Sequence, residues 1–145
     1  MKKDQQLLNG NGHLGGTSAT LYTLFLPLNY NNGRRIPHEK LSWTLNEIVR
    51  HTGGLSRYAP GLGLWVAPNS IVYRDRVLPV QLATSPDEAT QTWFTRFAVQ
   101  TAVLLEQQCI FLVAQHVQLL EATPSLLSVN NEEGWYNKKS RTVYV

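Results

Sequence analysis

The sequence predicts one α+β domain in which two helices pack on one face of a four-stranded antiparallel sheet. The first observation is the order of hydrophobic patterns, which reads strand, helix, strand, strand, helix, strand. The second is an early strand that is apolar on both of its faces. Helices repeat apolar residues every three to four positions, whereas strands alternate or, when enclosed, run continuously. The length of 145 residues fits one domain, which buries roughly 70% of its unfolded surface.

The first predicted strand covers residues 21–28 and is the doubly apolar one. One face is formed by Tyr22, Leu24, Leu26 and Leu28, and the other by Leu21, Thr23, Phe25 and Pro27. A strand with one face in water alternates apolar and polar residues, so this strand is expected at the centre of the sheet. Regular pairing is expected to stop near Pro27, because proline has no N–H to donate.

Start and stop signals define the elements that follow the first strand. Pro37 suits a first helical turn, and the Gly53-Gly54 pair suits a helix end. A pair of strands then follows, in which a glycine-rich bend interrupts the first strand and a short turn leads into the second. The predicted bounds are a helix at 38–51, strand segments at 55–59 and 64–66 around a bend at 60–63, a turn at 68–70 and a strand at 71–83.

The second helix has the clearest local start signal in the chain. Ser85 and Glu88 stand three residues apart as a capping box, and Pro86 takes the first helical position. The helical pattern ends at residues 106–108, and a last strand is expected over residues 109–120. Cys109, which follows a helix and lacks the setting that activates a thiol, is expected to be a small buried hydrophobe.

This element order resembles the ferredoxin-like fold, a split βαβ arrangement, over roughly 100 residues. Right-handed crossovers in that fold place the first and third strands in the middle of the sheet. The chain also resembles short uncharacterised bacterial proteins of this fold, through the motifs Phe25–Leu28, Asn32–Arg34, Gly53–Leu55 and Gly63–Trp65. The resemblance implies a fold and brings no activity with it.

Composition sets the expected domain limits and compartment. Residues 1–18 are predicted to be a flexible leader, residues 19–121 the domain, and residues 122–145 a tail that is either loose or docked. The single cysteine and the lack of a signal or membrane segment favour a cytoplasmic protein that does not associate with membranes. Eight Arg or Lys against six Asp or Glu between residues 20 and 120 give too slight an excess to argue for nucleic acid.

The uncovered face of the sheet leads to the functional hypothesis. Two helices cover one face only, yet the first and last strands carry apolar residues on both faces, and each such residue gains roughly 1.5–3 kcal/mol from burial. A second subunit, the tail or a ligand is therefore expected to cover the open face. The favoured interpretation is a non-enzymatic binding or regulatory module that forms a homodimer through this face and engages a protein or small ligand. The alternatives are a small-molecule enzyme and a nucleic-acid-binding domain.

Few residues are candidates for a site. Tyr73, Asp75 and Gln81 are expected on the open face, with Arg57 or Trp65 joining them from the neighbouring strand. The candidates for a basic patch are Arg57, Arg74 and Arg76. No catalytic residue can be named, and no histidines stand at metal-ligand spacing, so no metal is predicted. The glycines at 61–63 lack the continuation of a phosphate-binding loop, and therefore no cofactor is predicted either.

Overall fold

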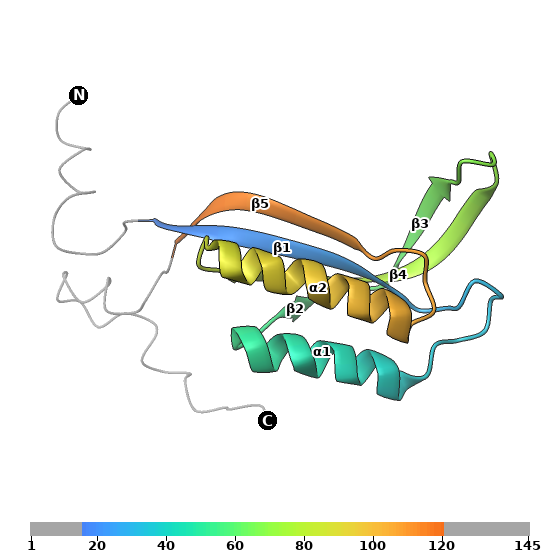
Figure 1. Ribbon diagram of the computed structural model, residues 1–145, viewed down its shortest axis with the longest axis horizontal. Coiled ribbons are helices and arrows are strands. Elements are labelled where there is room, and N and C mark those ends of the chain that lie inside the picture. Colours follow the sequence, from blue (N-terminus) through green and yellow to red (C-terminus); the bar gives the residue numbers. More distant parts are fainter. Residues whose placement is uncertain (1–15, 121–145) are drawn as a thin grey trace, which may run out of the picture. The chain divides into compact units, whose positions relative to one another are not determined.

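The computed structural model describes residues 16–120, which form one five-stranded sheet and two helices (Figure 1). In chain order the elements are β1 (Thr17–Pro27), α1 (His38–Thr52), β2 (Ser56–Arg57), β3 (Gly61–Val66), β4 (Val72–Thr84), α2 (Glu88–Leu104) and β5 (Phe111–Leu119). This is the predicted ferredoxin-like α+β fold. The predicted leader, apart from residues 16–18, and the predicted tail at 122–145 lie outside the described residues.

The centre of the sheet is formed by β1 and β4, as predicted for the first strand and the long strand before the second helix. The strand order is β2-β4-β1-β5, and β3 also pairs with β4. The antiparallel pairing of β1 with β4 runs from Thr20 opposite Thr84 to Pro27 opposite Val77. The expectation that the doubly apolar strand is central is confirmed, and β1 ends at Pro27 as predicted.

The predicted second strand is in fact two strands, so the sheet has five strands rather than four. β2 pairs with β4 at Gln81 and Val80, whereas β3 pairs with β4 from Val77 to Val72. The interruption falls at residues 58–60, and the glycines expected to form a bend lie inside β3. After β2 the Tyr58 N–H still donates a hydrogen bond of 3.0 Å to the Pro79 carbonyl oxygen, and Pro60, which has no N–H to donate, lies in the gap before β3.

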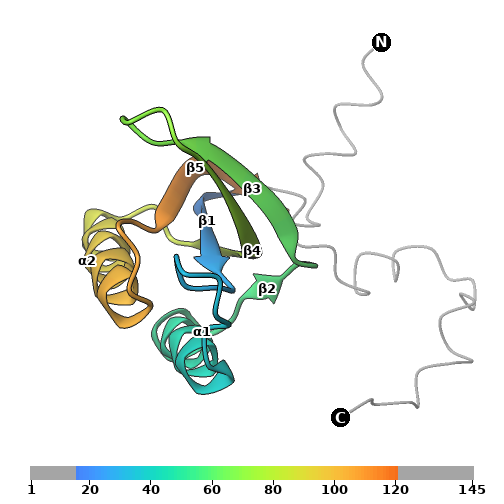
Figure 2. The same ribbon diagram turned by 90° about the vertical axis from the view of Figure 1, so that its right-hand side faces the viewer.

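Both helices lie on the same side of the sheet (Figure 2). They cover one face of β1 and β4, and the buried side chains there form a single core. Its members are Tyr22, Leu24, Leu26, Ile48, Leu78, Val80, Leu82, Phe94 and Phe97. The rings of Tyr22 and Phe94 stack with centroids 4.2 Å apart, which joins the central strand directly to α2.

The helix ends follow the predicted signals in one case and depart from them in the other. Gly53 closes α1 in the left-handed region, at a φ of 89° that favours glycine. The predicted cap of α2 is wrong by two residues. Asp87 is the N-cap instead of Ser85, because its carboxylate accepts hydrogen bonds from both the N–H and the hydroxyl of Thr90, at 2.7 and 2.9 Å.

Candidate ligand-binding site

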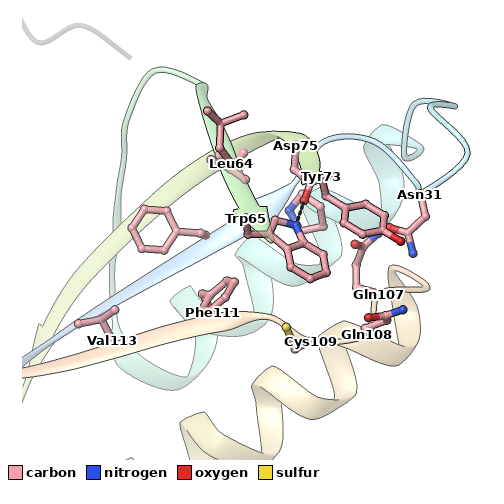
Figure 3. A pocket seen from close by; sticks show the side chains of 14 residues that line it. Asn31, Leu64, Trp65, Tyr73, Asp75, Gln107, Gln108, Cys109, Phe111 and Val113 are labelled. Atoms are coloured by element: carbon pink, nitrogen blue, oxygen red, sulfur yellow. Dashed lines mark hydrogen bonds between the residues drawn. The ribbon is translucent and has the colours of Figure 1, made fainter. Parts of the chain in front are cut away.

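A pocket of about 500 Å³ lies on the sheet face opposite the helices. This volume falls within the range of small-molecule sites in proteins. Side chains from four strands and two loops line it: Phe25, Pro27, Asn31, Gly63, Leu64, Trp65, Tyr73, Asp75, Val77, Gln107, Gln108, Cys109, Phe111 and Val113. Figure 3 shows these side chains around one opening.

The alternation of β3 creates the space for this pocket. Successive side chains of a strand point to opposite faces, and the register places Gly63 opposite Asp75 and Trp65 opposite Tyr73. Gly61 shares this face, opposite Val77. Two of the three β3 positions on the pocket side therefore have no side chain, and the third carries a large indole. The glycines expected to form a bend instead leave room beside Trp65.

Trp65, Tyr73 and Asp75 form a fixed unit in the wall of the pocket. The indole Nε1 of Trp65 donates a hydrogen bond of 2.7 Å to Oδ2 of Asp75 (Figure 3). The rings of Trp65 and Tyr73 stack with centroids 4.6 Å apart and planes 15° from parallel. The hydrogen bond and the stacking together hold the indole in one orientation. All three side chains are half-buried, so each retains surface for a ligand.

The rest of the pocket has an apolar wall and a polar rim. Phe25 and Pro27 come from the open face of β1, and Phe111 and Val113 come from β5. Asn31 in the β1–α1 loop and Gln107 and Gln108 in the α2–β5 loop supply amide groups. Amides both donate and accept hydrogen bonds without carrying charge. The pocket can therefore hold an apolar, ring-sized group and bond to its polar edge.

Cys109 is not the buried hydrophobe that the sequence suggested. It is exposed and lines the pocket. The strand expected to begin there begins instead at Phe111, so Cys109 lies in the connection after α2. Glu106 in that connection has a φ of 54°, which turns the chain away from the helix axis.

Gln81 and Arg57 do not join the other candidate residues. Gln81 is six residues from Asp75 along β4, roughly 20 Å at strand spacing. There it accepts a hydrogen bond of 2.9 Å from the Tyr58 hydroxyl and donates one of 3.1 Å to Thr23. Arg57 pairs with the buried Val80 and so belongs to the helix side, which corrects its expected place on the open face.

The three arginines of the predicted basic patch share one face, and it is not the face of the pocket. Arg74 and Arg76 alternate with Tyr73 and Asp75 along β4, on the same side as the buried Val80. All three arginine side chains are exposed. The basic residues and the stacked rings therefore lie on opposite faces, whereas a base-stacking nucleic-acid surface needs both kinds of residue together.

Sequence patterns named three of the fourteen lining residues as site candidates, Trp65, Tyr73 and Asp75, and the signals available for the others differ. Phe25 and Phe111 could have been assigned to the open face, because alternation within their strands fixes their side. Asn31 and Gln107 had no such signal, since their places depend on the paths of two loops.

Among residues 16–120, no group of His, Cys, Asp and Glu is arranged to hold a metal ion. No helix in this range is long and apolar enough to span a membrane.

Comparison with known proteins identifies the fold. No protein-family model matches the chain, and no curated protein does. A phage SAM lyase solved in complex with S-methyl-5′-thioadenosine is similar in structure, with a TM-score of 0.55 and 11% identity over 77% of this chain and 95% of that one. A phage SAM lyase in its apo state gives a TM-score of 0.53 at 11% identity, over 77% of this chain and 90% of that one. CutA1 from Oryza sativa gives a TM-score of 0.51 at 10% identity, over 82% of this chain and 98% of that one.

Proposed function

We propose that this protein is a small-molecule binding module whose ligand occupies the pocket on the open sheet face. One observation carries the proposal: Trp65 is stacked on Tyr73 and fixed by Asp75, in the wall of a pocket of about 500 Å³. An aromatic surface held in one orientation gives a flat ring a place to stack at little entropic cost. The amide groups on the rim can then bond to polar atoms at the edge of the ring.

A purine nucleoside is the ligand type that best combines these requirements. It has a flat ring, hydrogen-bonding edges and a size suited to this pocket. The similar phage SAM lyase was solved with S-methyl-5′-thioadenosine. At 11% identity that likeness concerns the fold alone. The assignment of a nucleoside therefore rests on the flat ring surface and the amide groups of the pocket.

The test is titration of S-methyl-5′-thioadenosine into the full chain by calorimetry. We expect saturable binding that weakens about tenfold or more in Trp65→Ala, because the stacking surface is lost. Trp43→Ala is the matched control, since Trp43 is 46% exposed on α1, on the helix side. Equal affinity in the wild type and Trp65→Ala would contradict the proposal, and so would the absence of any saturable heat.

The single cysteine gives an independent readout of where the ligand sits. Cys109 is the only cysteine in the sequence, and it lines the pocket. A thiol reagent such as DTNB should therefore react more slowly when the pocket is filled. Unchanged reactivity at saturating ligand would place the binding elsewhere on the chain.

Self-association through the open face is a further part of the proposed function. Phe111 and Val113 remain 60% and 41% exposed on β5, and burying them against a second copy would remove apolar surface from water. Because both residues line the pocket, a second copy there would also close its open side. Light scattering over a concentration series should give a dimer of the 16.4 kDa chain. A single-chain mass at every concentration would exclude the homodimer.

A small-molecule enzyme is the second candidate, and the carboxylate of Asp75 is the observation in its favour. Only Oδ2 accepts the Trp65 hydrogen bond, and Oδ1 has no partner among the described residues. A free carboxylate oxygen in a pocket can accept a proton or stabilise a developing positive charge. Incubation with SAM, followed by detection of S-methyl-5′-thioadenosine, tests this candidate. Turnover that disappears in folded Asp75→Asn would support an enzyme, whereas binding without turnover would support the binding module.

A further inference from the structure

The charge of the pocket defines the kind of ligand that it can accept. Asp75 is the only charged side chain among its lining residues, all of which belong to the described part of the chain. The other polar side-chain groups of the lining are the amides of Asn31, Gln107 and Gln108, the hydroxyl of Tyr73, the indole N–H of Trp65 and the thiol of Cys109. The formal charge of the lining is therefore negative, although the whole sequence carries +3.

The nearest arginines along the chain do not change this balance. Arg74 and Arg76 flank Asp75 in sequence, but the alternation of β4 directs them to the opposite face. Both are exposed, so water and salt screen their charges. Arg34, in the same loop as Asn31, lies over the ring of Tyr30 at 5.6 Å from its centroid and is not part of the pocket lining.

The aromatic rings of the pocket act in the same direction as the carboxylate. The faces of Trp65 and Tyr73 carry negative electrostatic potential, which attracts cations and repels anions. Oδ1 of Asp75 lies in the same wall with no hydrogen-bond partner among the described residues. A cationic group in the pocket could reach both the carboxylate and the rings, whereas a phosphate would meet no positive partner to offset its dehydration.

We infer that the pocket selects nucleosides by charge: it accepts a purine nucleoside whose 5′ substituent is neutral or cationic and excludes the 5′-phosphate. This inference rests on the proposed function and adds a rule about the ligand's charge. The exclusion of phosphate distinguishes this pocket from the many nucleotide sites that hold phosphate with backbone amides at a helix N-terminus. Here no helix begins at the pocket, since its loop residues follow β1 and α2.

Three adenosines that differ only at the 5′ position test the rule. They are adenosine, which is neutral, 5′-amino-5′-deoxyadenosine, whose amine is protonated at neutral pH, and adenosine 5′-monophosphate. Calorimetry on the full chain at low salt should give the tightest binding for the amine, about tenfold tighter than for adenosine. Adenosine 5′-monophosphate should bind at least about tenfold more weakly than adenosine.

Asp75→Asn isolates the contribution of the charge. The asparagine Oδ1 can still accept the Trp65 hydrogen bond, so the wall keeps its shape while the carboxylate is lost. The variant should retain adenosine binding and lose the preference for the amine. Asp87→Asn is the matched control, because it removes one negative charge at the N-cap of α2 and leaves the pocket intact.

The outcomes distinguish a failure of the charge rule from a failure of the proposed nucleoside site. If adenosine binds but the three 5′ groups bind equally, or the phosphate binds best, the charge rule is wrong and the proposed pocket stands. If Asp87→Asn changes the order as much as Asp75→Asn does, net charge rather than the pocket carboxylate sets the preference, and the rule is again overturned. If none of the three adenosines binds, the proposed nucleoside site fails first.

Discussion

The two faces of the central sheet use the same strands for different purposes. On the helix side, Leu24 and Leu26 of β1 are fully buried. One residue along, Phe25 is half-buried on the other face and lines the pocket. Both faces are apolar in sequence, and the difference comes from the helices, which cover one side only. Apolar alternation in a central strand can thus serve the core on one side and a binding surface on the other.

The open face is itself divided between an apolar end and a polar end. Toward β3, the glycines of that strand and the Trp65–Tyr73 pair surround the pocket. Toward β2, Gln81 fills the surface and bonds to Tyr58 and Thr23. A face whose polar side chains bond to one another offers little to a ligand, whereas the end near β3 retains empty space. The site therefore lies at the end of the open face where the pairing of β4 with β1 gives way to its pairing with β3.

Truncation of the helix-covered face should have the largest effect. Leu24→Ala removes a side chain that is 0% exposed in the core. The free energy of unfolding should therefore fall by about 2–5 kcal/mol through lost burial and a residual cavity. Phe111→Ala on the open face is the comparison, made at protein concentrations too low for the proposed dimer to form. Phe111 is 60% exposed in the single chain, so its truncation should then change stability by about 0.5 kcal/mol or less. Urea unfolding followed by circular dichroism measures both. Similar losses for the two variants would mean that the open face is covered in solution.

Filling the pocket should abolish binding while sparing the fold. A Cβ at Gly63 would lie 3.6 Å from the Asp75 carbonyl oxygen and 3.7 Å from Val77 Cγ1, which are ordinary contacts. Gly63→Val should therefore fold normally, place its methyl groups in the pocket and weaken ligand binding by about tenfold or more. Gly54→Ala is the control, since nothing lies within 4 Å of its Cβ position. Calorimetry measures the affinity, and an unchanged melting temperature shows that the variant is folded. Retained affinity in Gly63→Val would locate the ligand elsewhere.

The order of elements and the central position of β1 follow from periodicity, which is why the fold could be predicted. Trp65, Tyr73 and Asp75 were predicted as candidates because strand alternation fixes the face of each residue. The path of the chain between elements was not predictable in this way. Cys109 and Gln107 reach the pocket through the loop after α2, and Arg57 belongs to the helix side because β2 is a separate short strand. Local sequence patterns predict which face of the sheet a strand residue occupies, whereas the residues that loops bring to a site depend on tertiary packing.

The smallest effect on stability is expected at the N-cap of α2. The charge of Asp87 there makes the stability of the helix-covered side depend on pH. The N–H of Thr90, and then its hydroxyl, hold the pKa of Asp87 below its usual range. A carboxylate with a lowered pKa stabilises the fold above its unfolded pKa, about 3.9, and this contribution is lost as pH falls through the folded value. Asp87→Ala should lower the melting temperature by a few degrees at pH 7 and by less at pH 3. Asp87→Asn keeps an uncharged cap, so its stability should lack this acid-dependent part.

This pH dependence also separates the two faces. The charge of Asp87 acts on the core side, where burial, and secondarily this charge, raises the pKa of Tyr22. The stacked pair of Trp65 and Tyr73 lies on the other face, and its hydrogen bond to Asp75 does not involve the cap. Lowering the pH should therefore reduce the stability of the wild type more than that of Asp87→Ala. At pH 7, Asp87→Ala should bind the ligand with unchanged affinity. A loss of affinity in Asp87→Ala would show that the two faces are coupled through β1 and β4, and that the pocket depends on the helices covering the other side.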